Sequence, residues 1–533
     1  MRYINRKPSA PHQDRQSSPK PDHPVRARTA LRQNDLSEQL DDNLQNLKEL
    51  LEKCSDAVTR EFLIGSEVTV KAAMLYFDGM IDRQEIEEHL LRPLLRLKAE
   101  PESLTEESRA HFIELSIQQL LPMGEIKTLS TLEAVCDHIT AGDTVLLIDG
   151  HKQGIVVGTR SWQGRSINSP ENESTIWGPK EGFTETLRFN TAQLRRRLKS
   201  TDFKIEAMSI GRISKTNVVV CYIEDIASES LISEIRRRLE IIDIDAILDT
   251  GYLEEYISDE KFSIMAQVEY TEKPDRICGH LLEGRAAILV DGSPMAMVVP
   301  TSFPQFLNAG EDYYQNFIAA SLLRVGRFIA FFIALLLPSV YVAVVTYHQE
   351  MIPLSLYLTL VAARQGVPFP AAIEALMLEL TFELLREAGL RLPRAIGPAV
   401  SIVGALIIGD AAVQAGLVGT PMVVVVAFTG IASFVTPSYN AGLMVRILRF
   451  GMLLLAATLG FFGIIMGLLI LAARMASLSS LGQPYLSPIA PFNLAQISDI
   501  LIRRPWSLNS KRPYQESMKN QARQNLPRDR EES

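Results

Sequence analysis

Cysteine is scarce in this chain, and the few cysteines that occur show no functional spacing. The four of them, Cys54, Cys136, Cys221 and Cys278, lie far apart in the sequence. Their separations match neither a metal-binding motif nor a redox motif. We therefore expect reduced, mostly buried thiols.

Catalytic signatures are also missing. The sequence has no Walker loop, no HExxH, no GxSxG and no paired set of Cys and His residues, and its eight histidines are scattered. These absences argue against an enzyme and predict no catalytic residue, no metal site and no cofactor. The formal net charge of −8 argues against a nucleic-acid partner.

Charged residues nearly disappear between Phe328 and Ala473, where long apolar runs dominate. A helix needs about 20 apolar residues to cross the roughly 30 Å hydrocarbon core of a bilayer. The pattern predicts a multi-pass α-helical membrane domain over residues 321–475. Its four clear spans are predicted at 328–347, 395–415, 417–435 and 452–473, with a short hairpin or re-entrant element at 352–388.

The N-terminal tail (1–35) is basic, rich in proline and without an apolar core, so we expect a disordered tail and not a secretory signal. The large N-terminal half is therefore expected to be cytoplasmic. Arg324 and Arg327, just before the first span, agree with this orientation, because basic residues favour the cytoplasmic side.

The polar, basic C-terminal tail (476–533) is predicted to be cytoplasmic as well, which requires an even number of crossings. The four spans satisfy this requirement if 352–388 returns to its starting face. If that hairpin crosses once, the tail lies outside and several arginines lie inside. These are Arg386, Arg391, Arg394, Arg446 and Arg449.

Residues 36–320 are expected to form a soluble α/β or α+β cytoplasmic domain with two subdomains. Leucines recur at helical spacing from Leu36 to about Leu121, which predicts a helical start. Strand signals follow, because apolar runs flank Asp149-Gly150, a pair typical of hairpin turns, and the same arrangement returns around Asp291-Gly292. This echo indicates either two subdomains of similar build or two hairpins of one subdomain.

Four carboxylates interrupt the apolar segment PFPAAIEALMLELTFELLREAGLRLP, between Pro368 and Pro393. On a helix Glu379, Glu383 and Glu387 fall within about 80° of one another, and Glu374 lies about 140° from Glu379. The segment therefore predicts a short apolar helix with one acidic stripe, and Arg386 lies beside Glu379 on that helix.

Two interpretations of the stripe remain open. A helix at the membrane surface would turn the stripe to water and its leucines to acyl chains. A helix packed in a bundle would turn the stripe into a hydrated pathway, because ionisable groups inside a membrane are costly unless they are solvated or paired. Rings of acidic side chains select cations, so Glu379, Glu383 and Glu374 are candidates for an ion path or gate.

Two further polar residues interrupt the apolar runs. Asp410 lies near the end of its predicted span, where its carboxylate either reaches the membrane surface or belongs to the pathway. Asn440 belongs with Pro437 and Ser438 to a polar break between two spans. The break is either a simple turn or a place where bare backbone meets an ion path.

Several segments carry a resemblance to a known family. In the soluble half these are GPKEGFTETLRFNTAQLRRRL (Gly178 to Leu198) and EKPDRICGHLLEGRAAILVDGSPMAMVVP (Glu272 to Pro300). In the membrane half they are RQGVPFPAAIEALMLELTFELLREAGLRLP, the spans up to TPSYN (Thr436 to Asn440), and PFNLAQISDILIRRPW (Pro491 to Trp506). In this order, over about residues 50–515, the chain resembles the A-subunit family of bacterial spore germinant receptors, the GerA type.

The resemblance implies a subunit of a nutrient-sensing complex in the inner membrane of a dormant endospore. Partners are then a transporter-like B subunit, a lipoprotein C subunit, membrane lipid and further copies of the chain. It also implies a ligand-gated cation channel whose opening begins germination. The alternative is a scaffold that does not conduct and couples the B subunit to a separate effector.

Overall fold

The computed structural model describes most of the chain, and the chain divides into two compact units. The described residues are 31–32, 34–64, 70–95, 126–161, 170, 173, 175–391, 409–492, 500–509, 511–512 and 518–523. Most of the predicted tail 1–35 and of the predicted span 395–415 lies outside them. The units are Met1–Glu52 with Ala57–Phe77 and Ile81–Arg160, and Lys53–Asp56 with Asp78–Met80 and Ser161–Ser533.

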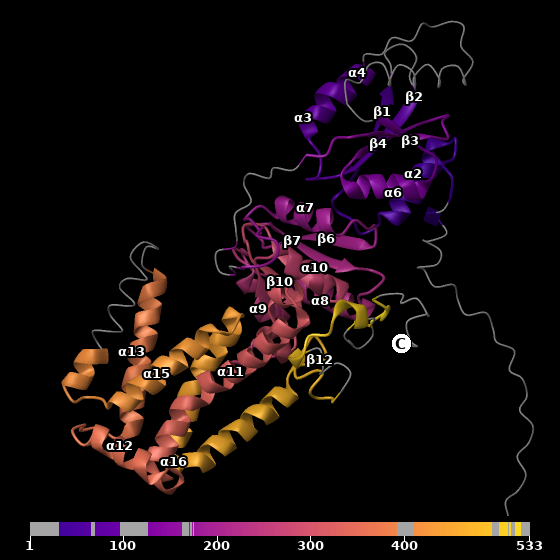
Figure 1. The fold of residues 1–533 in the computed structure, drawn as a ribbon. Helices are drawn as coiled ribbons and strands as arrows, with labels where there is room; N and C mark the ends of the chain where they lie inside the picture. The colour runs from indigo at the N-terminus through magenta and orange to yellow at the C-terminus, as the bar shows by residue number, and fades with distance from the viewer. Residues whose placement is uncertain are drawn as a thin grey trace, which may run out of the picture. The chain divides into compact units, whose positions relative to one another are not determined.

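An antiparallel five-stranded sheet with the order β1-β2-β4-β5-β3 forms the centre of the first unit (Figure 1). Apolar side chains such as Met74, Leu90 and Leu146 form its core between the sheet and the helices. The elements are α2 (Leu40–Leu50), β1 (Ala57–Ile64), β2 (Val70–Phe77), α3 (Arg83–Glu85), the π-helix η1 (Ile86–Leu91), α4 (Arg92–Leu95), β3 (Ile126–Leu129), α6 (Leu132–Ala141), β4 (Thr144–Ile148) and β5 (Gly154–Val157).

The prediction of a helical start is wrong between α2 and α3. Residues 57–77 form the hairpin of β1 and β2, in which Ala57 pairs with Phe77 and Ile64 pairs with Val70. Strand β2 lies between β1 and β4 and is largely buried, and its Ala72 and Met74 pack within the sheet core. Burial in a sheet overrides the leucine spacing here, because strand preference depends on the tertiary surface that a segment covers.

The second unit begins with a sheet of its own, in the order β6-β7-β9-β10-β8. All strand pairs of both sheets are antiparallel, so the soluble half has the α+β arrangement of the two predicted alternatives. The elements are α7 (Leu187–Arg197), β6 (Phe203–Ile210), β7 (Thr216–Ile223), α8 (Glu229–Glu240), α9 (Gly251–Ile257), β8 (Glu269–Thr271), α10 (Pro274–Leu282), β9 (Ala286–Val290), β10 (Ala296–Val299), η3 (Phe303–Leu307) and η4 (Gly310–Tyr313).

The two sheets repeat one topology and one set of turn contacts. Numbered within each sheet, the strands have the same order, first, second, fourth, fifth and third. Asp149 Oδ1 accepts the Leu40 backbone N–H at 3.0 Å, and Asp291 Oδ1 accepts the Leu187 N–H at 3.1 Å. Each turn therefore fastens the first helix of its own subdomain. The sequence echo marks two subdomains of similar build, the first of the two alternatives.

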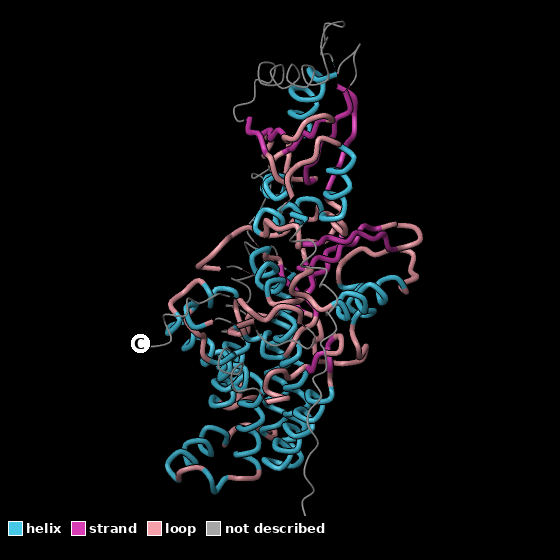
Figure 2. Tube along the Cα trace, turned by 90° about the vertical axis from the view of Figure 1, so that its right-hand side faces the viewer, coloured by secondary structure: helices cyan, strands magenta, loops and turns pink. Residues whose placement is uncertain are grey.

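Between residues 317 and 477 the described part of the second unit is almost entirely helical. Figure 2 draws its helices in cyan, and we call residues 317–477 the helical half. Two of its helices, α11 and α16, are long and apolar enough to cross a membrane. The elements from there on are α11 (Phe317–Thr346), η5 (Gln349–Met351), α12 (Leu354–Arg364), α13 (Ala371–Arg391), α15 (Thr420–Phe434), α16 (Tyr439–Ser477), β11 (Ser479–Ser480), β12 (Gln483–Pro484) and η6 (Trp506–Leu508).

Helix α16 is broken at Gly460, where φ is +60° and ψ is −140°. Only glycine adopts such a conformation without strain. A side chain on Gly463 would meet the carbonyl oxygen of Leu455, and one on Gly467 would meet the Met452 sulfur, so the two arms fold back on each other. The predicted span 452–473 therefore contains a sharp bend and is not one continuous helix.

The contacts along α11 fix the direction of each arm. The first arm runs parallel to α11, because Arg449 bonds the carbonyl of Ala334 and Ala457 accepts from Tyr347 Oη, at 2.8 and 2.7 Å. The second arm returns, and near its end Arg474 pairs with Glu260 of the soluble segment after α9. We call the end where α11 begins the near end and the end at Gly460 the far end.

Candidate functional site

Three carboxylates of α13, those of Glu374, Glu379 and Glu383, face other helices, and several of its apolar side chains are exposed. Glu374 and Glu379 are 0 % and 1 % exposed, whereas Leu380 and Leu384 are exposed. This orientation is opposite to that of a surface helix with its stripe in water. It also differs from an open acidic pathway, because the carboxylates are paired with arginines.

Glu379 makes the most deeply buried of these pairs. Its Oε2 lies 2.6 Å from Arg449 Nη1, and both side chains are almost fully buried. The Arg449 Nε also donates to the carbonyl of Ala334 on α11. One guanidinium therefore ties α13 and α11 to the first arm of α16, and a charge-assisted bond of this kind is strong in an apolar setting.

Glu383 lies one turn further along α13 and contacts two arginines. Its Oε2 lies 3.2 Å from Arg446 Nη1, and its Oε1 lies 3.6 Å from Arg386 Nη1. Arg386 also donates to Ser433 Oγ on α15 and lies over the ring of Phe434 at 4.5 Å. We call Glu379, Glu383, Arg386, Arg446 and Arg449 the charge cluster; it joins α13 to α15 and α16.

Glu374 does not belong to the charge cluster. It lies toward the far end, where its Oε1 accepts Arg364 Nη2 of α12 at 3.0 Å and its Oε2 accepts the Gly419 N–H at 3.1 Å. Gly419 is the N-cap of α15, so a negative charge at this place is favourable for the helix dipole. Glu374 thus fastens the hairpin of α12 and α13 to the start of α15.

The other two candidates lie apart from the glutamates. Asp410 is exposed and accepts Gln414 Nε2 at 2.7 Å, one turn along the same helical segment. Asn440 is half-buried in the first turn of α16, directly after the turn that separates α16 from α15. The structure brings neither residue into contact with the charge cluster.

Sequence reasoning found the glutamates but used Arg446 and Arg449 only to judge the topology. A usable signal was present, because Glu379 and Glu383 are four residues apart on one helix and Arg446 and Arg449 are three apart on another. Both spacings place like charges on one helix face. Two such faces of opposite charge in an apolar domain predict that the helices pair.

The cluster lies closer to the near end than to the far end of the apolar bundle. The uncharged run of α11 begins at Phe328, and Ala334, the partner of Arg449, is six residues later. At 1.5 Å per residue the Glu379–Arg449 pair therefore lies about 9 Å along α11 from the start of that run. Arg446 lies about one turn nearer to the start.

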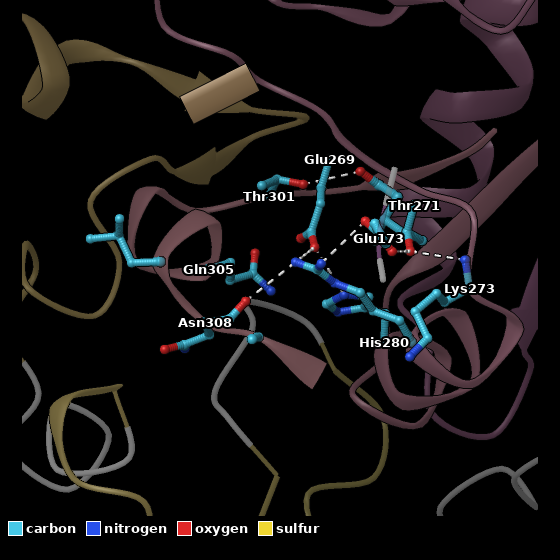
Figure 3. A network of polar contacts seen from close by, with 12 residues as sticks. Glu173, Glu269, Thr271, Lys273, His280, Thr301, Gln305 and Asn308 are labelled. Atoms are coloured by element: carbon cyan, nitrogen blue, oxygen red, sulfur yellow. Dashed lines mark hydrogen bonds and ion pairs between the residues drawn. The ribbon is translucent and has the colours of Figure 1, made fainter. Parts of the chain in front are cut away.

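The second sheet holds a separate buried ionic network (Figure 3). Glu269 of the edge strand β8 is fully buried and pairs with Arg276 and His280, both on α10. Arg276 also contacts Glu173 at 3.4 Å and the carbonyl of Asn308 at 3.4 Å. Asn308 follows η3, so the network connects the sheet to the segment that leads into α11.

The pKa values of the two glutamates in this network are shifted in opposite directions. Burial by itself disfavours the charged form of Glu269, but Arg276 and His280 outweigh this effect and lower its pKa to about 2. For Glu173 burial wins over Arg276 and raises the pKa above the usual range. Among the described residues, no group of three His, Cys, Asp or Glu side chains is placed to hold a metal ion.

Comparison with known proteins gives a consistent family. Residues 45–515 match the family model "Bacillus/Clostridium GerA spore germination protein". The chain is 43% identical over 478 residues to the uncharacterized membrane protein YfkQ of Bacillus subtilis strain 168, covering 90% of this chain and 91% of that protein. It is 41% identical over 489 residues to spore germination protein KA of the same strain, with 92% and 89% covered.

A solved structure is also similar to part of the chain. It is the crystal structure of the N-terminal domain of the A subunit of the Bacillus megaterium spore germinant receptor GerK3. The match covers 51% of this chain and 98% of that domain at 32% identity, with a TM-score of 0.40.

Proposed function

The chain belongs to the GerA family of spore germination proteins, and we propose that it is a membrane-embedded subunit of a nutrient germinant receptor in the spore inner membrane. In this proposal it passes nutrient binding on to ion release and acts as an oligomeric, ligand-gated cation channel, not as an enzyme. Its partners are a transporter-like B subunit, a lipoprotein C subunit and further copies of itself.

Helix directions support a multi-pass arrangement with both tails on the cytoplasmic side. Helix α11 and the first arm of α16 run from the near end to the far end, and α13 and α15 run back, as does the second arm. With the predicted span 395–415, which lies mostly outside the described residues, we propose six crossings. An even number places the soluble half and the basic C-terminal tail on one side, and it also leaves Arg386 and Arg446 close to that side.

The observation that carries the proposal is the charge cluster inside an apolar bundle. Charged side chains within a membrane are costly and usually mark ion pathways or switches. A buried pair adds little stability compared with apolar packing of similar volume, so its role is better sought in specificity or switching. We infer that Glu379–Arg449 and Glu383–Arg446 hold the closed state of the channel. When α13 moves from α16, the freed carboxylates face the cation path.

The scaffold remains a second candidate, because one observation favours it. Each carboxylate of α13 named above is already neutralised by an arginine, whereas a cation-selective ring needs free negative charge. In a scaffold the same ion pairs would only connect the helices, and the chain would relay the nutrient signal from the B subunit to a separate effector.

Nutrient-triggered K⁺ release from spores tests the proposal, with Glu379→Gln and Glu383→Gln in one chain. Subunit abundance is confirmed by immunoblot. Loss of the two ion pairs that hold the closed state is expected to change both the rate of release and the ratio of K⁺ to Na⁺ released. Glu387→Gln is the matched control, because Glu387 is exposed and, among the described residues, its ion pair is with Arg391 of its own helix.

Each result separates the candidates. A changed ion ratio at normal abundance supports the channel. A changed rate with an unchanged ratio supports the scaffold, because the cluster then affects signalling and not selectivity. If neither quantity changes, the charge cluster is not part of the signal, and the channel assignment for these residues is wrong.

A further inference from the structure

A short loop of the second unit exposes apolar side chains at its tip. It follows α9 and comprises residues 258–264. Phe262 at its tip is 102 % exposed and Ile264 is 50 % exposed, with the exposed cation Lys261 beside them. The tip therefore leaves the apolar area of two neighbouring side chains in water, which makes it a candidate for a contact with a membrane or a protein.

The loop is firmly attached to the near end of the helical half. Glu260 pairs with Arg474 in the last turn of α16, and Asp259 Oδ2 accepts Ser479 Oγ at 2.5 Å. Directly after the loop, Met265 is buried in the same apolar cluster as Phe331 of α11. That cluster extends along the helices, so it is the contacts with Arg474 and Ser479 that place the loop, at the near end where the second arm of α16 ends.

We propose that residues 258–264 dip into the lipid leaflet on the side of the soluble half. Phe262 and Ile264 would enter the boundary between headgroups and acyl chains, and Lys261 would contact lipid phosphates. The proposal rests on the membrane insertion of the helical half proposed above. It adds a second attachment to the bilayer, made by the soluble part and not by a spanning helix.

Lipid fits this loop better than a second copy of the chain does. A specific protein interface usually buries 1,200–2,000 Å² in total, whereas the loop offers one projecting tip of two apolar residues. Aromatic residues and lysine together are typical of the membrane surface, where rings lie at headgroup level and cations meet anionic lipid. Tyr256 on α9 continues this pattern, with Lys261 Nζ 5.6 Å from its ring centre.

Attachment of this loop to the membrane would affect how motion passes between the second sheet and the second arm of α16. Gln267, three residues after the loop, accepts Ser480 Oγ through its carbonyl at 2.8 Å, and β8 with Glu269 begins two residues later. A loop held in the leaflet would therefore fix the edge of the second sheet relative to the membrane at the end of the second arm of α16.

The test uses the full chain in vesicles of phosphatidylethanolamine and phosphatidylglycerol, labelled at Phe262→Cys with an environment-sensitive fluorophore. All four native cysteines are buried, so labelling is directed to the new thiol. Ile213→Cys, 77 % exposed in the turn between β6 and β7, is the control for a water-exposed apolar position. Leu469→Cys, 59 % exposed on the second arm of α16, is the control for lipid exposure.

Quenching by lipids with nitroxides in their acyl chains is the readout. We expect quenching and a blue-shifted emission at 262 and 469, and neither at 213. Replacing phosphatidylglycerol by a neutral lipid is expected to reduce quenching at 262, and less so when Lys261→Gln is present, because the cation is then already absent.

The outcomes distinguish the loop from the membrane domain. Quenching at 469 without quenching at 262 overturns the loop contact and leaves membrane insertion intact. No quenching at 469 contradicts membrane insertion of the helical half itself. If the label at 262 is protected both from lipid nitroxides and from a water-soluble quencher, a protein surface covers the loop and the lipid proposal is wrong.

Discussion

The two sheets of the soluble half share a framework but differ at corresponding positions. In the register of the edge strands, Lys127 lies opposite Val156 in the first sheet, and Glu269 lies opposite Val298 in the second. Lys127 is exposed, whereas Glu269 is fully buried in an ionic network. The repeated part is thus the hydrogen-bonded framework of strands and turns. The buried charge at the edge is specific to the sheet whose chain continues into α11.

The largest effect is expected from reversing the charge at these two positions. Glu269→Lys would remove the carboxylate that pairs with Arg276 and place a second cation beside this arginine inside the buried network, so we expect a loss of about 3–5 kcal/mol in the stability of the second sheet. Lys127→Glu changes an exposed side chain and should cost less than about 0.5 kcal/mol. Hydrogen exchange of the β8–β10 and β3–β5 amides in the full chain measures both. Equal losses in the two sheets would show that the edges are equivalent.

Acid should weaken the second sheet through the same carboxylate. The pKa of Glu269 is lowered to about 2 in the folded chain, whereas an unfolded glutamate titrates near 4.3. A lowered pKa means that the stabilisation is complete above about pH 4.3 and is lost as the pH falls toward 2, about 3 kcal/mol in all. The measurement is the difference in stability between wild type and Glu269→Gln as a function of pH. A constant difference between pH 5 and 2 would contradict the assignment.

The turns should respond equally in the two sheets. Gly150 and Gly292 have φ of +83° and +92°, and a Cβ added at either would meet nothing within 4 Å. Alanine at either position should therefore lower the stability only through the strain of holding a Cβ-bearing residue in the left-handed conformation, by about 1–2 kcal/mol in each sheet. Chemical unfolding of the two variants checks this, with Gly→Asn as a milder control. A clear inequality would mean that the two turns are not equivalent.

The smallest effect is expected at the turn aspartates. Asp149→Ala and Asp291→Ala each remove the acceptor for one backbone N–H at the start of a helix, which should cost about 1 kcal/mol in each case. Asparagine at the same positions keeps an oxygen acceptor and should recover most of the loss. If only one of the two helices loses protection from hydrogen exchange, the shared contact has different roles in the two subdomains.

Much of the fold was predictable because it follows from local patterns. The turn pairs Asp149-Gly150 and Asp291-Gly292 lie between β4 and β5 and between β9 and β10, as their flanking apolar runs predict. Helix α11 contains the predicted span 328–347 almost entirely. By contrast, the hairpin of β1 and β2 and the bend at Gly460 were missed, because long-range packing decides both.

The candidate site was predictable only by half. Glu379 and Glu383 stand out in the sequence as charges in an apolar helix, so their importance can be inferred from composition. Their partners were not identified, because Arg446 and Arg449 are far along the chain and equally suited to a membrane surface; only the matching spacing of the two pairs indicated that the helices meet. Hydropathy gives the depth of a residue in a membrane, but not the neighbouring helix that it faces.

The sequence alone determined the class of the protein: a soluble half of mixed strands and helices, α/β or α+β, followed by an apolar helical half with acidic residues at helical spacing. These features are set by composition and by periodicity, which act over a few residues. Tertiary structure decided that the carboxylates are neutralised by arginines, that α16 turns back at Gly460 and that Glu269 is buried where Lys127 is exposed. Each of these depends on which distant segments pack together, because the energy of a charge is set by its neighbours in space.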